Sequence, residues 1–520
     1  MESKNITLTT CSIFLPFLFI FWFILQTSDT FQLKHNHIAS SQQGSIDGLL
    51  ASGFNRESCL SRYESSTYRK TPSNFKPSSH LLSRLRRYED LHRRCGPNTH
   101  LYNKTIELIT GRQSDSTGLE CNYVVWLPFS GLGNRMLTLS SAFLYALLTN
   151  RVLLVDAANE MTNLFCEPFL QTSWLLPNNF PLLDQITKIE ETPPQYYGQM
   201  MKNGIIGYSN NSVPSFLYLN LAHDYDDHDK LFFCDQDQDF LSKVPWLVLR
   251  SNNYFIPSLF LIPSFQNELE RLFPEKEAVF HHLGRYLFHP TNEVWGLITR
   301  YYEAYLAKAD KKIGIQIRVL ESGDGEIEPY QHVIEQVLAC TWKEEILPET
   351  NYEMKPAISF PKRKKHKAVL VTSLNSGYYE KMKDLYWENP TVNGEVMEFY
   401  QASHEEFQHS ENQKHNSKAW AEIYLLSLTD ELVTSSWSTF GYVAQGLGGL
   451  RPWILTMPVN KTVPEPACKR AMSMEPCFHA PPHPKFNCRR RRKEEGIDEE
   501  EIVSHVRQCE DRSWGLKLFD

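Results

Sequence analysis

The feature that most constrains this chain is a repeated alternation of apolar strands and helices in its middle. "YVVWLPF" at 123–129 has the apolar run of a buried strand, "GLGNR" at 131–135 forms a turn, and "MLTLSSAFLYALLT" at 136–149 has helical length. The next strand, "RVLLVDA" at 151–157, carries Asp156 near its end. Strand, helix and strand in this order predict a βαβ unit with a parallel sheet and a right-handed crossover.

A second set of apolar strands follows in the C-terminal half. The strand runs are "KIGIQIRVL" (312–320), "KAVLVTSL" (367–374), "DELVTSS" (430–436) and "PWILTM" (452–457), with helical patterns between them. A doubly wound sheet binds its ligand outside the carboxyl ends of its strands. The sequence therefore predicts an α/β protein with two Rossmann-like doubly wound domains that face each other across a cleft.

The N-terminal part has a different character. Residues 11–25 carry no charge and are dominated by Phe, Ile and Leu, which favours an uncleaved membrane anchor over the alternative of a cleaved signal peptide. The polar stretch that follows has no sustained apolar period. We expect a cytoplasmic tail at 1–10, an anchor at 11–26, a stem at 27–85, an N-terminal α/β domain at 86–305 and a C-terminal α/β domain with an extension at 306–520.

Charge and cysteine content narrow the class of protein. A net charge of -8 at pH 7 argues against a nucleic-acid binder, and we expect the basic runs at 362–367 and 488–493 to be solvated loop charge. Ten of the eleven cysteines lie beyond the anchor, in spacings that match no CxxC metal pattern. With three sequons, these cysteines favour an oxidising secretory lumen. The predicted glycosylation sites are Asn103, Asn210 and Asn460.

Two turns and one strand end carry the candidate anion-binding groups. "FSGLGNR" lacks the third glycine of a dinucleotide fingerprint, but a helix N-terminus binds anions and Arg135 adds a charged fork beside it. Gln316 and Arg318 project to one face at the end of their strand, where a guanidinium suits a diphosphate. In "SSWSTFG", Ser436, Ser438 and Thr439 offer hydroxyls and capping amides.

An acidic segment offers a competing interpretation. Asp235, Asp237 and Asp239 alternate along "CDQDQDF", a pattern that could hold a metal on a nucleotide diphosphate, and His223 and His228 could join them as ligands. A polar loop that gathers acids is the commoner explanation. The open alternative is a metal-dependent glycosyltransferase that uses this cluster.

Three long segments resemble one family. "SGLGNRMLTLSSAFLYALLTNRVLLVD", "FHHLGRYLFHPTNEVWG" and "SWSTFGYVAQGLGGLRPWIL" are similar to the plant fucosyltransferase family that includes xyloglucan and arabinogalactan fucosyltransferases. The resemblance implies a type II Golgi membrane protein with a GT-B-like catalytic region. It implies transfer of L-fucose from GDP-fucose, with inversion and without a metal or other cofactor, to a galactose 2-hydroxyl of a cell-wall polysaccharide or glycoprotein glycan, in cell-wall biosynthesis.

The resemblance also assigns roles to residues. It implies that Arg318 anchors the GDP diphosphate, and that the 86–305 domain takes the acceptor while the 306–520 domain takes the donor. At Asn252, in "LRSNNYF", members of the family tend to carry Asp, which puts activity or acceptor choice in question. The other implied donor-site residues are Gly131, Gly133, Asn134, Arg135, Gly314, Gln316, Ser436, Trp437, Ser438, Thr439, Phe440 and Gly441.

The catalytic base and the partners are less constrained. Asp156, at a strand end beside the first loop, is the leading candidate for the general base, with a water relay as an alternative. We expect the glycan acceptor to be recognised within the irregular 158–305 region. A catalytically silent relative that binds glycans or acts as a Golgi scaffold is a further alternative. A homodimer is also open.

Overall fold

The computed structural model describes residues 45–69, 74–111, 118–186, 195–206, 213–319, 331–351, 365–482, 488 and 504–520. Residues 1–48 and residues 49–520 form two separate units, of which only the short helix η1 (Ser45–Gly48) is described in the first. The predicted tail and anchor lie outside the described residues, as does Asn210. Within the described residues, no helix combines the length and hydropathy needed to span a bilayer.

The N-terminal sheet of the second unit has four parallel strands in the order β2-β1-β4-β3. Its strands are almost entirely buried, because helices cover both faces and apolar runs can fill both sides of a parallel sheet. The predicted βαβ unit is confirmed as β1-α5-β2. The strands and the linking helix are β1 (Asn122–Leu127), α5 (Leu132–Leu148), β2 (Arg151–Val155), β3 (Phe216–Asn220) and β4 (Trp246–Arg250).

The C-terminal sheet has the order β10-β9-β8-β5-β6-β7, and only the edge strand β10 runs antiparallel to its neighbour. The expected α/β architecture with two parallel sheets is therefore confirmed. The elements of this region are β5 (Lys311–Gln316), α13 (Gln331–Lys343), β6 (His366–Thr372), α14 (Gly377–Glu388), β7 (Val396–Tyr400), α15 (Gln413–Leu426), β8 (Glu431–Thr434), α16 (Thr439–Gly448), β9 (Trp453–Leu455) and β10 (Cys468–Arg470).

Each sheet has a topological switch point. In the C-terminal sheet the chain winds from β5 through β6 to β7, then returns to the other side of β5 through β8 and β9. In the N-terminal sheet the switch lies between β1 and β4. Loops that leave neighbouring strands at a switch point diverge and open a crevice, so ligands bind there. The order of the strands alone therefore predicts two ligand-binding crevices, one in each sheet.

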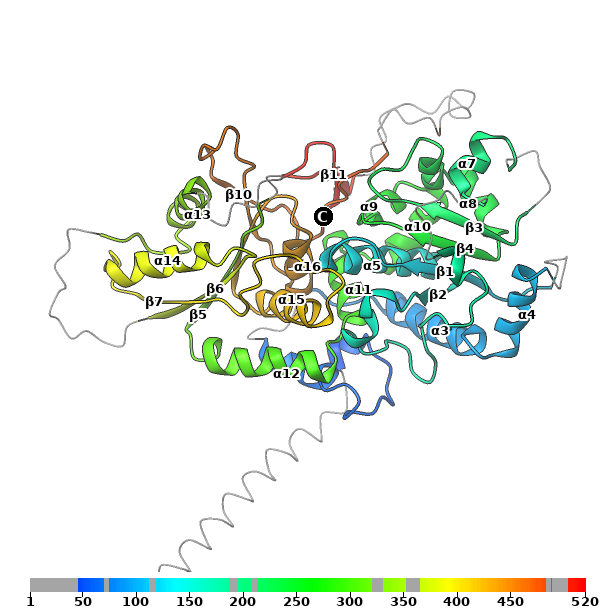
Figure 1. Cartoon of the computed structure of the whole chain (residues 1–520), viewed down its shortest axis with the longest axis horizontal. Helices are drawn as coiled ribbons and strands as arrows, with labels where there is room; N and C mark the ends of the chain where they lie inside the picture. Colours follow the sequence, from blue (N-terminus) through cyan, green and yellow to red (C-terminus); the bar gives the residue numbers. More distant parts are fainter. Residues whose placement is uncertain are drawn as a thin grey trace, which may run out of the picture. The chain divides into compact units, whose positions relative to one another are not determined.

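The helices α5, α11, α15 and α16 form a shared layer between the two sheets (Figure 1). The remaining helices before β5 are α2 (Ser61–Glu64), η2 (Ser65–Tyr68), α3 (Ser79–Cys95), α4 (His100–Ile109), η3 (Ala158–Asn163), α6 (Leu183–Ile186), α7 (Tyr197–Lys202), η4 (Asp229–Phe233), α8 (Asp235–Ser242), α9 (Ile256–Leu259), α10 (Pro263–Leu272), η5 (Lys276–Ala278), α11 (Val279–Leu287), α12 (Asn292–Tyr301) and η6 (Tyr302–Leu306).

Helices α11 and α12 pack against α16 and α15, so they belong with the C-terminal sheet although they precede β5 in the chain. A sequence boundary at residue 305 does not separate the two packing units for this reason. Two glycines permit the close approach: a Cβ on Gly446 would lie 2.4 Å from Phe280 Cδ1, and one on Gly284 would lie 2.9 Å from Leu447 Cδ2. The helix layer fixes one sheet relative to the other.

The prediction of a stem that reaches residue 85 is wrong, because the fold already begins at residue 49. Leu49 and Leu50 are buried, and Cys59 forms a disulfide with Cys166. The short helix α2 also packs on the folded part, because the Glu64 carboxylate accepts a 2.9 Å hydrogen bond from the indole of Trp295. The segment has no sustained apolar period because it adds single buried side chains to a core that other elements build.

Five disulfides tie distant parts of the second unit together. They resolve the connectivity that the cysteine spacings left open. The pairs are Cys59–Cys166, Cys95–Cys121, Cys234–Cys488, Cys340–Cys468 and Cys477–Cys509.

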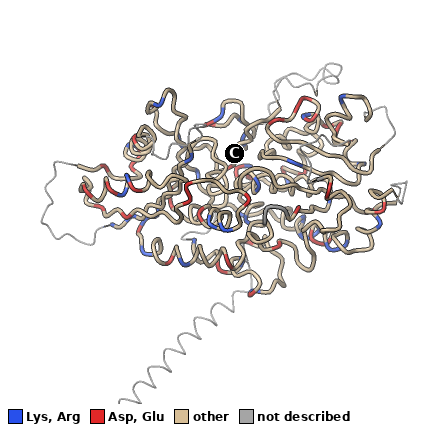
Figure 2. Tube along the Cα trace, in the orientation of Figure 1, with Lys and Arg blue, Asp and Glu red and all other residues tan. Residues whose placement is uncertain are grey.

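The surface carries both signs of charge and two of the predicted sequons. Acidic and basic residues are interspersed along the described trace (Figure 2). Asn103 on α4 and Asn460 in a turn after β9 are both exposed. Glycan attachment is sterically open at both positions.

The C-terminal segment returns across the helix layer. It forms a small hairpin from β11 (Val506–Gln508) and β12 (Leu516–Leu518). Before the hairpin, the fully buried Glu475 accepts hydrogen bonds of 2.6 Å from the Tyr254 hydroxyl and from the Phe280 amide. At the end of the chain, the Asp520 carboxylate accepts a 2.7 Å hydrogen bond from the Lys276 amide. The extension therefore fastens the loop after β4 to α11, and Asp520 to η5.

The close helix packing can be tested with two alanine substitutions. Gly446→Ala pushes α16 away from Phe280, and overpacking of this kind costs about 1–3 kcal/mol of unfolding free energy. In the matched control Gly296→Ala, the nearby atoms belong to the side chain of Arg300, which can move. We expect a lower melting temperature for Gly446→Ala and an equal or higher one for the control. An unchanged melting temperature for Gly446→Ala would contradict the tight contact.

Buried Glu475 makes stability depend on pH. Burial raises the pKa of Glu475 to about 8 in the folded chain. A carboxyl group whose pKa is higher in the folded than in the unfolded state binds its proton more tightly when folded, so its contribution to stability falls as pH rises from the unfolded pKa towards 8. Glu475→Gln lacks this titration. Its melting temperature relative to the parent chain should rise between pH 5 and pH 8, and a constant difference would contradict the assignment.

Candidate functional site

A cavity of about 330 Å³ opens at the carboxyl end of the C-terminal sheet, where the switch point between β5 and β8 predicts a ligand. Its wall combines residues from both domains and from the C-terminal extension. The lining residues are Gly131, Leu132, Gly133, Asn134, Gln316, Ile317, Arg318, Thr372, Ser373, Leu374, Ser403, Glu405, Gln408, Ser410, His415, Asn416, Ala419, Glu422, Trp437, Ser438, Thr439, Phe440 and His479.

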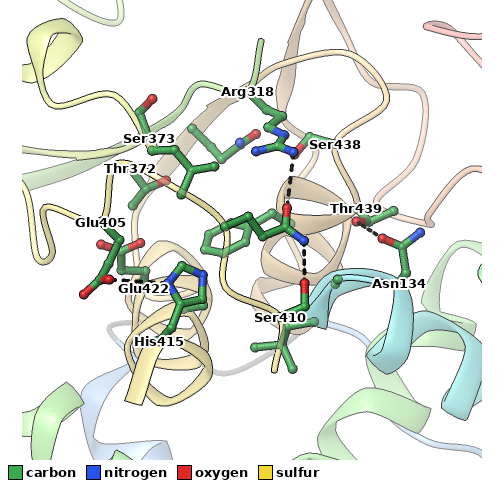
Figure 3. A pocket seen from close by; sticks show the side chains of 18 of the residues that line it. Asn134, Arg318, Thr372, Ser373, Glu405, Ser410, His415, Glu422, Ser438 and Thr439 are labelled. Carbon is green, nitrogen blue, oxygen red and sulfur yellow. Dashed lines mark hydrogen bonds and ion pairs between the residues drawn. The ribbon is translucent and has the colours of Figure 1, made fainter. Parts of the chain in front are cut away.

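Arg318 supplies a cation to this cavity (Figure 3). Its backbone amide donates a 2.9 Å hydrogen bond to the Ser435 hydroxyl, which fixes the strand end, and its guanidinium donates to Gln408 Oε1 at 3.2 Å. Burial lowers the pKa of Arg318, and no carboxylate in the described part of the chain offsets this cost. A half-buried guanidinium whose partner is a neutral amide is poised to take an anion.

Two helix N-termini face the same space. Helix α5 begins after its N-cap Gly131, and α16 begins after its N-cap Ser438, whose hydroxyl accepts a hydrogen bond from the Gly441 amide. A Cβ on Gly133 would lie 2.7 Å from Thr439 Oγ1, so only glycine lets the two first turns come this close. The positive ends of two helix dipoles thus point at one cavity beside Arg318.

Asn134 joins the two domains across the cavity mouth (Figure 3). Its Oδ1 accepts a 3.1 Å hydrogen bond from the Thr439 hydroxyl, and its Nδ2 donates to the Asn252 carbonyl at 2.9 Å. The Asn252 side chain in turn contacts the backbone and ring of His223, at 2.9 and 2.7 Å. Asn252 does not line the cavity, but this chain of contacts connects the switch point of one sheet to that of the other.

A cluster of ionisable groups occupies another side of the cavity (Figure 3). Glu422 accepts hydrogen bonds from the amide and hydroxyl of Ser403, at 2.9 and 2.7 Å, and burial raises the pKa of its carboxyl to about 7. Glu405 pairs with Lys418 and with His415 Nδ1, the latter at 3.5 Å. This side of the cavity can accept hydrogen bonds from ligand N–H and O–H groups.

Trp437 closes the cavity next to α16. Its backbone is in the left-handed region, with φ of 60°, and its amide donates a 3.0 Å hydrogen bond to Asp511 Oδ2. The guanidinium of Arg512 lies 4.4 Å from the centre of the Trp437 indole. The C-terminal segment therefore holds the strained turn that presents Ser438 and Thr439 to the cavity.

The structure brings together nine of the predicted donor-site residues and places the other four elsewhere. In the cavity wall are Gly131, Gly133, Asn134, Gln316, Trp437, Ser438, Thr439 and Phe440, together with Arg318. Gly314 faces Leu426 and Leu432 in the core, so its small size serves strand–helix packing. Gly441 lies against Thr434, where a Cβ would be 1.9 Å from Oγ1.

Arg135 and Ser436 also act away from the cavity. Arg135 is buried, and its guanidinium donates to the Ser410 carbonyl at 3.2 Å and lies 3.4 Å from a Glu411 carboxylate oxygen. It holds the loop that carries Gln408 and does not line the cavity. The Ser436 hydroxyl donates to the Leu455 carbonyl and faces a second cavity of about 300 Å³ behind Arg318. The direction of α5 decides the placement of Arg135, and the pairing of β8 with β9 decides that of Ser436.

The predicted base does not reach the cavity. Asp156 follows β2, an edge strand, and its amide donates to the Trp126 carbonyl at 3.0 Å. It is not among the residues that line the cavity, because the crevice of this sheet opens between β1 and β4 and not at β2. Asp156 remains a prediction that the geometry does not favour.

The acidic cluster does not converge on one point. Asp235, Asp237 and Asp239 lie on helix α8, where alternate residues face opposite sides. Asp237 is buried and accepts a hydrogen bond from the Tyr197 hydroxyl, whereas the other two are exposed. Among the described residues, the one His, Cys and carboxylate group close enough to hold a metal includes the disulfide-bonded Cys477 and Cys509. The three carboxylates do not meet at one point because the segment is helical and not extended.

Sequence reasoning missed the residues contributed by the 401–422 segment and by the C-terminal extension. Ser403, Gln408, His415 and Glu422 sit in or after an irregular loop whose sequence shows no motif. His479 reaches the cavity because the extension folds back onto α16. A short run of Ser, His and Glu after a strand was the only available signal. Chemically, the assembled cavity suits a ligand with a diphosphate and an attached polar ring system.

Comparisons with known proteins find similar chains. A model of the xyloglucan fucosyltransferase family matches residues 24–489. The galactoside 2-alpha-L-fucosyltransferase of Pisum sativum is 61% identical over 476 residues, covering 91% of this chain and 82% of that protein. The enzyme of the same name from Arabidopsis thaliana is 59% identical over 475 residues, with the same coverages. A mutant of Arabidopsis thaliana FUT1 solved in complex with GDP is 57% identical, with a TM-score of 0.82, over 91% of this chain and all of that one.

The anion site can be tested without any sugar. Arg318→Ala removes the one cation that lines the cavity among the described residues, so binding of inorganic pyrophosphate to the full chain should weaken by about 10- to 100-fold. Isothermal titration calorimetry measures this change. Arg470→Ala is the matched control, because Arg470 lies on β10 and pairs with Glu431. Equal losses in both variants would show that pyrophosphate binds through general surface charge and not at the cavity.

Proposed function

Because the chain belongs to the xyloglucan fucosyltransferase family, we propose that it transfers L-fucose from GDP-fucose to the 2-hydroxyl of a galactose residue in a plant cell-wall glycan. The relatives named galactoside 2-alpha-L-fucosyltransferases support the linkage, and the similar chain solved with GDP supports the donor. The observation that carries the proposal is Arg318, a half-buried cation without a carboxylate partner in the described residues, which lines one cavity with two helix N-termini.

In this proposal the C-terminal sheet binds the donor. The diphosphate lies against Arg318 and the first turn of α16, with the amides after Ser438 as additional donors. As the bond between fucose C1 and the β-phosphate oxygen breaks, negative charge grows on the departing GDP, and these groups stabilise it more strongly than they stabilise the ground state. Glu422 and Ser403 lie on a different side of the cavity and can take the hydrogen-bond donors of the guanine or ribose.

The acceptor approaches from the N-terminal domain. Asn134 lines the cavity and donates a hydrogen bond to the carbonyl of Asn252, which lies outside the cavity on the side of the N-terminal sheet. An acceptor hydroxyl held there can attack fucose C1 from the face opposite the diphosphate, and a single displacement of this kind inverts the anomeric configuration. The proposal of inversion rests on this two-sided arrangement.

We propose that the reaction needs no metal. The support is that Arg318 and two helix N-termini already supply positive charge, and that Asp237 is buried on the face of α8 opposite the exposed Asp235 and Asp239. Chelation with EDTA should therefore leave the rate unchanged. A loss of activity in EDTA that Mg²⁺ or Mn²⁺ restores would overturn this part of the proposal.

We also propose a single-pass type II protein of the Golgi membrane with its catalytic part in the lumen. Five disulfides and exposed sequons at Asn103 and Asn460 are compatible with an oxidising lumen. The apolar run at 11–26 provides the anchor in this proposal. We propose xyloglucan as the acceptor because the matching family model is named for it. A homodimer is a further prediction.

The decisive experiment measures GDP release by the purified full chain with GDP-fucose across a panel of galactose-bearing glycans. We expect acceptor-dependent release, a decrease of about 10-fold or more in kcat/KM for Arg318→Lys, and no decrease for Arg470→Ala. The Lys variant keeps the charge but loses the planar fork, so it tests geometry separately from charge. Full activity of Arg318→Lys would contradict a bidentate diphosphate contact.

Asn252 distinguishes an active enzyme from a silent relative. Its amide is engaged by His223 and its carbonyl by Asn134. If the parent chain binds GDP but releases none with any acceptor, the variant Asn252→Asp becomes the test. Gain of activity in that variant would favour a relative that lost catalysis at this position.

A further inference from the structure

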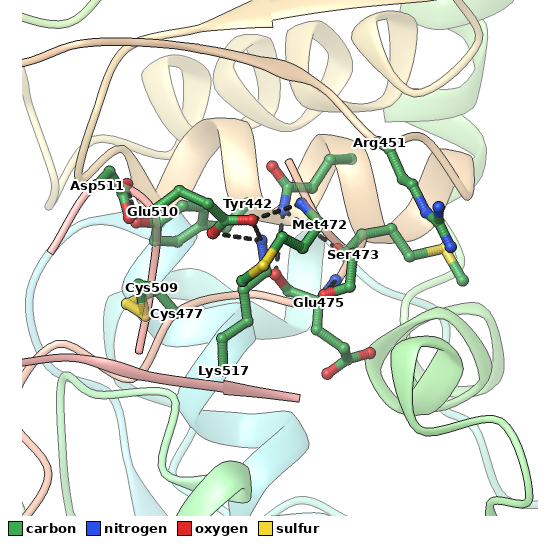
Figure 4. A network of polar contacts seen from close by, with 12 residues as sticks. Tyr442, Arg451, Met472, Ser473, Glu475, Cys477, Cys509, Glu510, Asp511 and Lys517 are labelled. Carbon is green, nitrogen blue, oxygen red and sulfur yellow. Dashed lines mark hydrogen bonds and ion pairs between the residues drawn. A yellow bond between two sulfur atoms is a disulfide. The ribbon is translucent and has the colours of Figure 1, made fainter. Parts of the chain in front are cut away.

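A chain of hydrogen bonds runs from the C-terminal segment into the cavity. Asp511 Oδ2 accepts a 2.5 Å hydrogen bond from the Tyr442 hydroxyl, and the Tyr442 oxygen lies 3.0 Å from His479 Nε2. Figure 4 shows Asp511 beside Tyr442, next to the disulfide between Cys477 and Cys509. His479 lines the cavity together with Trp437 and Thr439.

The direction of these hydrogen bonds fixes the tautomer of the histidine. The Tyr442 hydroxyl has a single proton, which it donates to the Asp511 carboxylate, so the Tyr442 oxygen must accept from His479 Nε2–H. In a neutral imidazole, a proton on Nε2 leaves Nδ1 with its lone pair. No partner of His479 Nδ1 occurs among the described residues, so this nitrogen is available to a ligand.

The position of His479 is set by covalent and polar contacts to both domains. The Cys477–Cys509 disulfide joins its segment to the segment of Asp511. The carbonyl of the next residue, Ala480, accepts a hydrogen bond from the Tyr225 hydroxyl. Tyr225 belongs to the N-terminal domain and lies two residues after His223, whose ring contacts the Asn252 side chain. The imidazole therefore lies where the donor cavity meets the N-terminal domain, on the side from which the acceptor arrives.

The other ionisable groups of the cavity are less suited to accept a proton there. Glu405 is committed to Lys418 and His415, and Glu422 accepts two hydrogen bonds from Ser403. Figure 3 shows Glu405, His415 and Glu422 gathered on one side of the cavity, with Thr439 and Asn134 on the other. His479, in contrast, is held by Tyr442 of α16, and the residue after it accepts the hydrogen bond of Tyr225.

We propose that His479 is the general base of the transfer, oriented by Tyr442 and Asp511; this inference rests on the proposed function. As the acceptor hydroxyl oxygen forms its bond to fucose C1, the bond between C1 and the β-phosphate oxygen breaks and GDP leaves with the electron pair. The hydroxyl proton passes to Nδ1 of His479, and the resulting imidazolium releases it to solvent. The products are the fucosylated glycan, GDP and one proton.

The surroundings keep the imidazole neutral before reaction. Burial lowers the pKa of His479 to about 4, and the nearby Arg512 guanidinium acts in the same direction, while the Asp511 carboxylate opposes it. The Arg512 Nε also donates a 2.8 Å hydrogen bond to the His479 carbonyl. During transfer, Asp511 stabilises the imidazolium through the Tyr442 hydroxyl, so the relay supports the charged state only when the proton arrives.

Chemical rescue tests the proposal in the full chain. His479→Ala should lower kcat with GDP-fucose and a galactose-bearing acceptor by about 10²- to 10⁴-fold, whereas GDP should bind with an affinity within about twofold of the parent value. Free imidazole should then restore turnover in proportion to its unprotonated fraction. His505→Ala, also in the C-terminal segment, is the control and should keep parental activity without responding to imidazole.

A second variant tests the relay while preserving the fold. Tyr442→Phe retains the ring but removes the oxygen that fixes the tautomer, so kcat should fall by about 10-fold with KM for GDP-fucose unchanged. Melting temperatures within a few degrees of the parent would exclude unfolding as the cause. Parental kcat in either His479→Ala or Tyr442→Phe would overturn the proposal. So would imidazole rescue of His415→Ala without rescue of His479→Ala. If the parent chain itself releases no GDP with any acceptor, the proposed function fails and not this residue assignment alone.

Discussion

The close approach of two helix N-termini at Gly133 is the contact on which the rest of the site depends. Because no side chain separates α5 from α16 at this point, the first turns of both helices meet, and each belongs to a different parallel sheet. Their positive ends then act on one space. The helix layer of α11, α15 and α16 holds this geometry, and Asn134 links the crevices of the two sheets through Thr439 and Asn252.

The two arginines near that contact have different roles. Arg318 has no carboxylate partner in the described part of the chain. Arg135, in the first turn of α5, instead contacts the Ser410 carbonyl and the Glu411 carboxylate. One arginine is therefore left for the ligand and the other secures the loop that completes the cavity. The C-terminal extension adds a third element, since Asp511 holds both the strained turn at Trp437 and, through Tyr442, the imidazole of His479.

Much of the fold could be predicted, because strand and helix signals are local. The βαβ unit after residue 122, the second set of strands and the cavity positions of Arg318, Ser438 and Thr439 followed from periodicity and from the rule for strand ends. The placements that differ from expectation share one cause. Asp156 and Gly314 were assigned to the site by their neighbours in sequence, and the acidic cluster on α8 was weighed as an alternative metal site, while strand order, side-chain facing and helical phase decided their actual surroundings.

The sequence by itself determined the two parallel sheets, the family and the cation at the end of β5, because each is encoded in a contiguous segment of about ten residues or in a long similar stretch. Only the tertiary structure decided which residues complete the site. His479 and Gln408 come from segments without a periodic pattern, and Glu422 comes from helix α15, whose pattern does not show which side chains face the cavity. They reach the cavity through a disulfide, buried hydrogen bonds and helix packing between parts of the chain far apart in sequence. Such contacts cannot be predicted from the spacing of residues along the chain, because each partner could form hydrogen bonds or pack with many other groups.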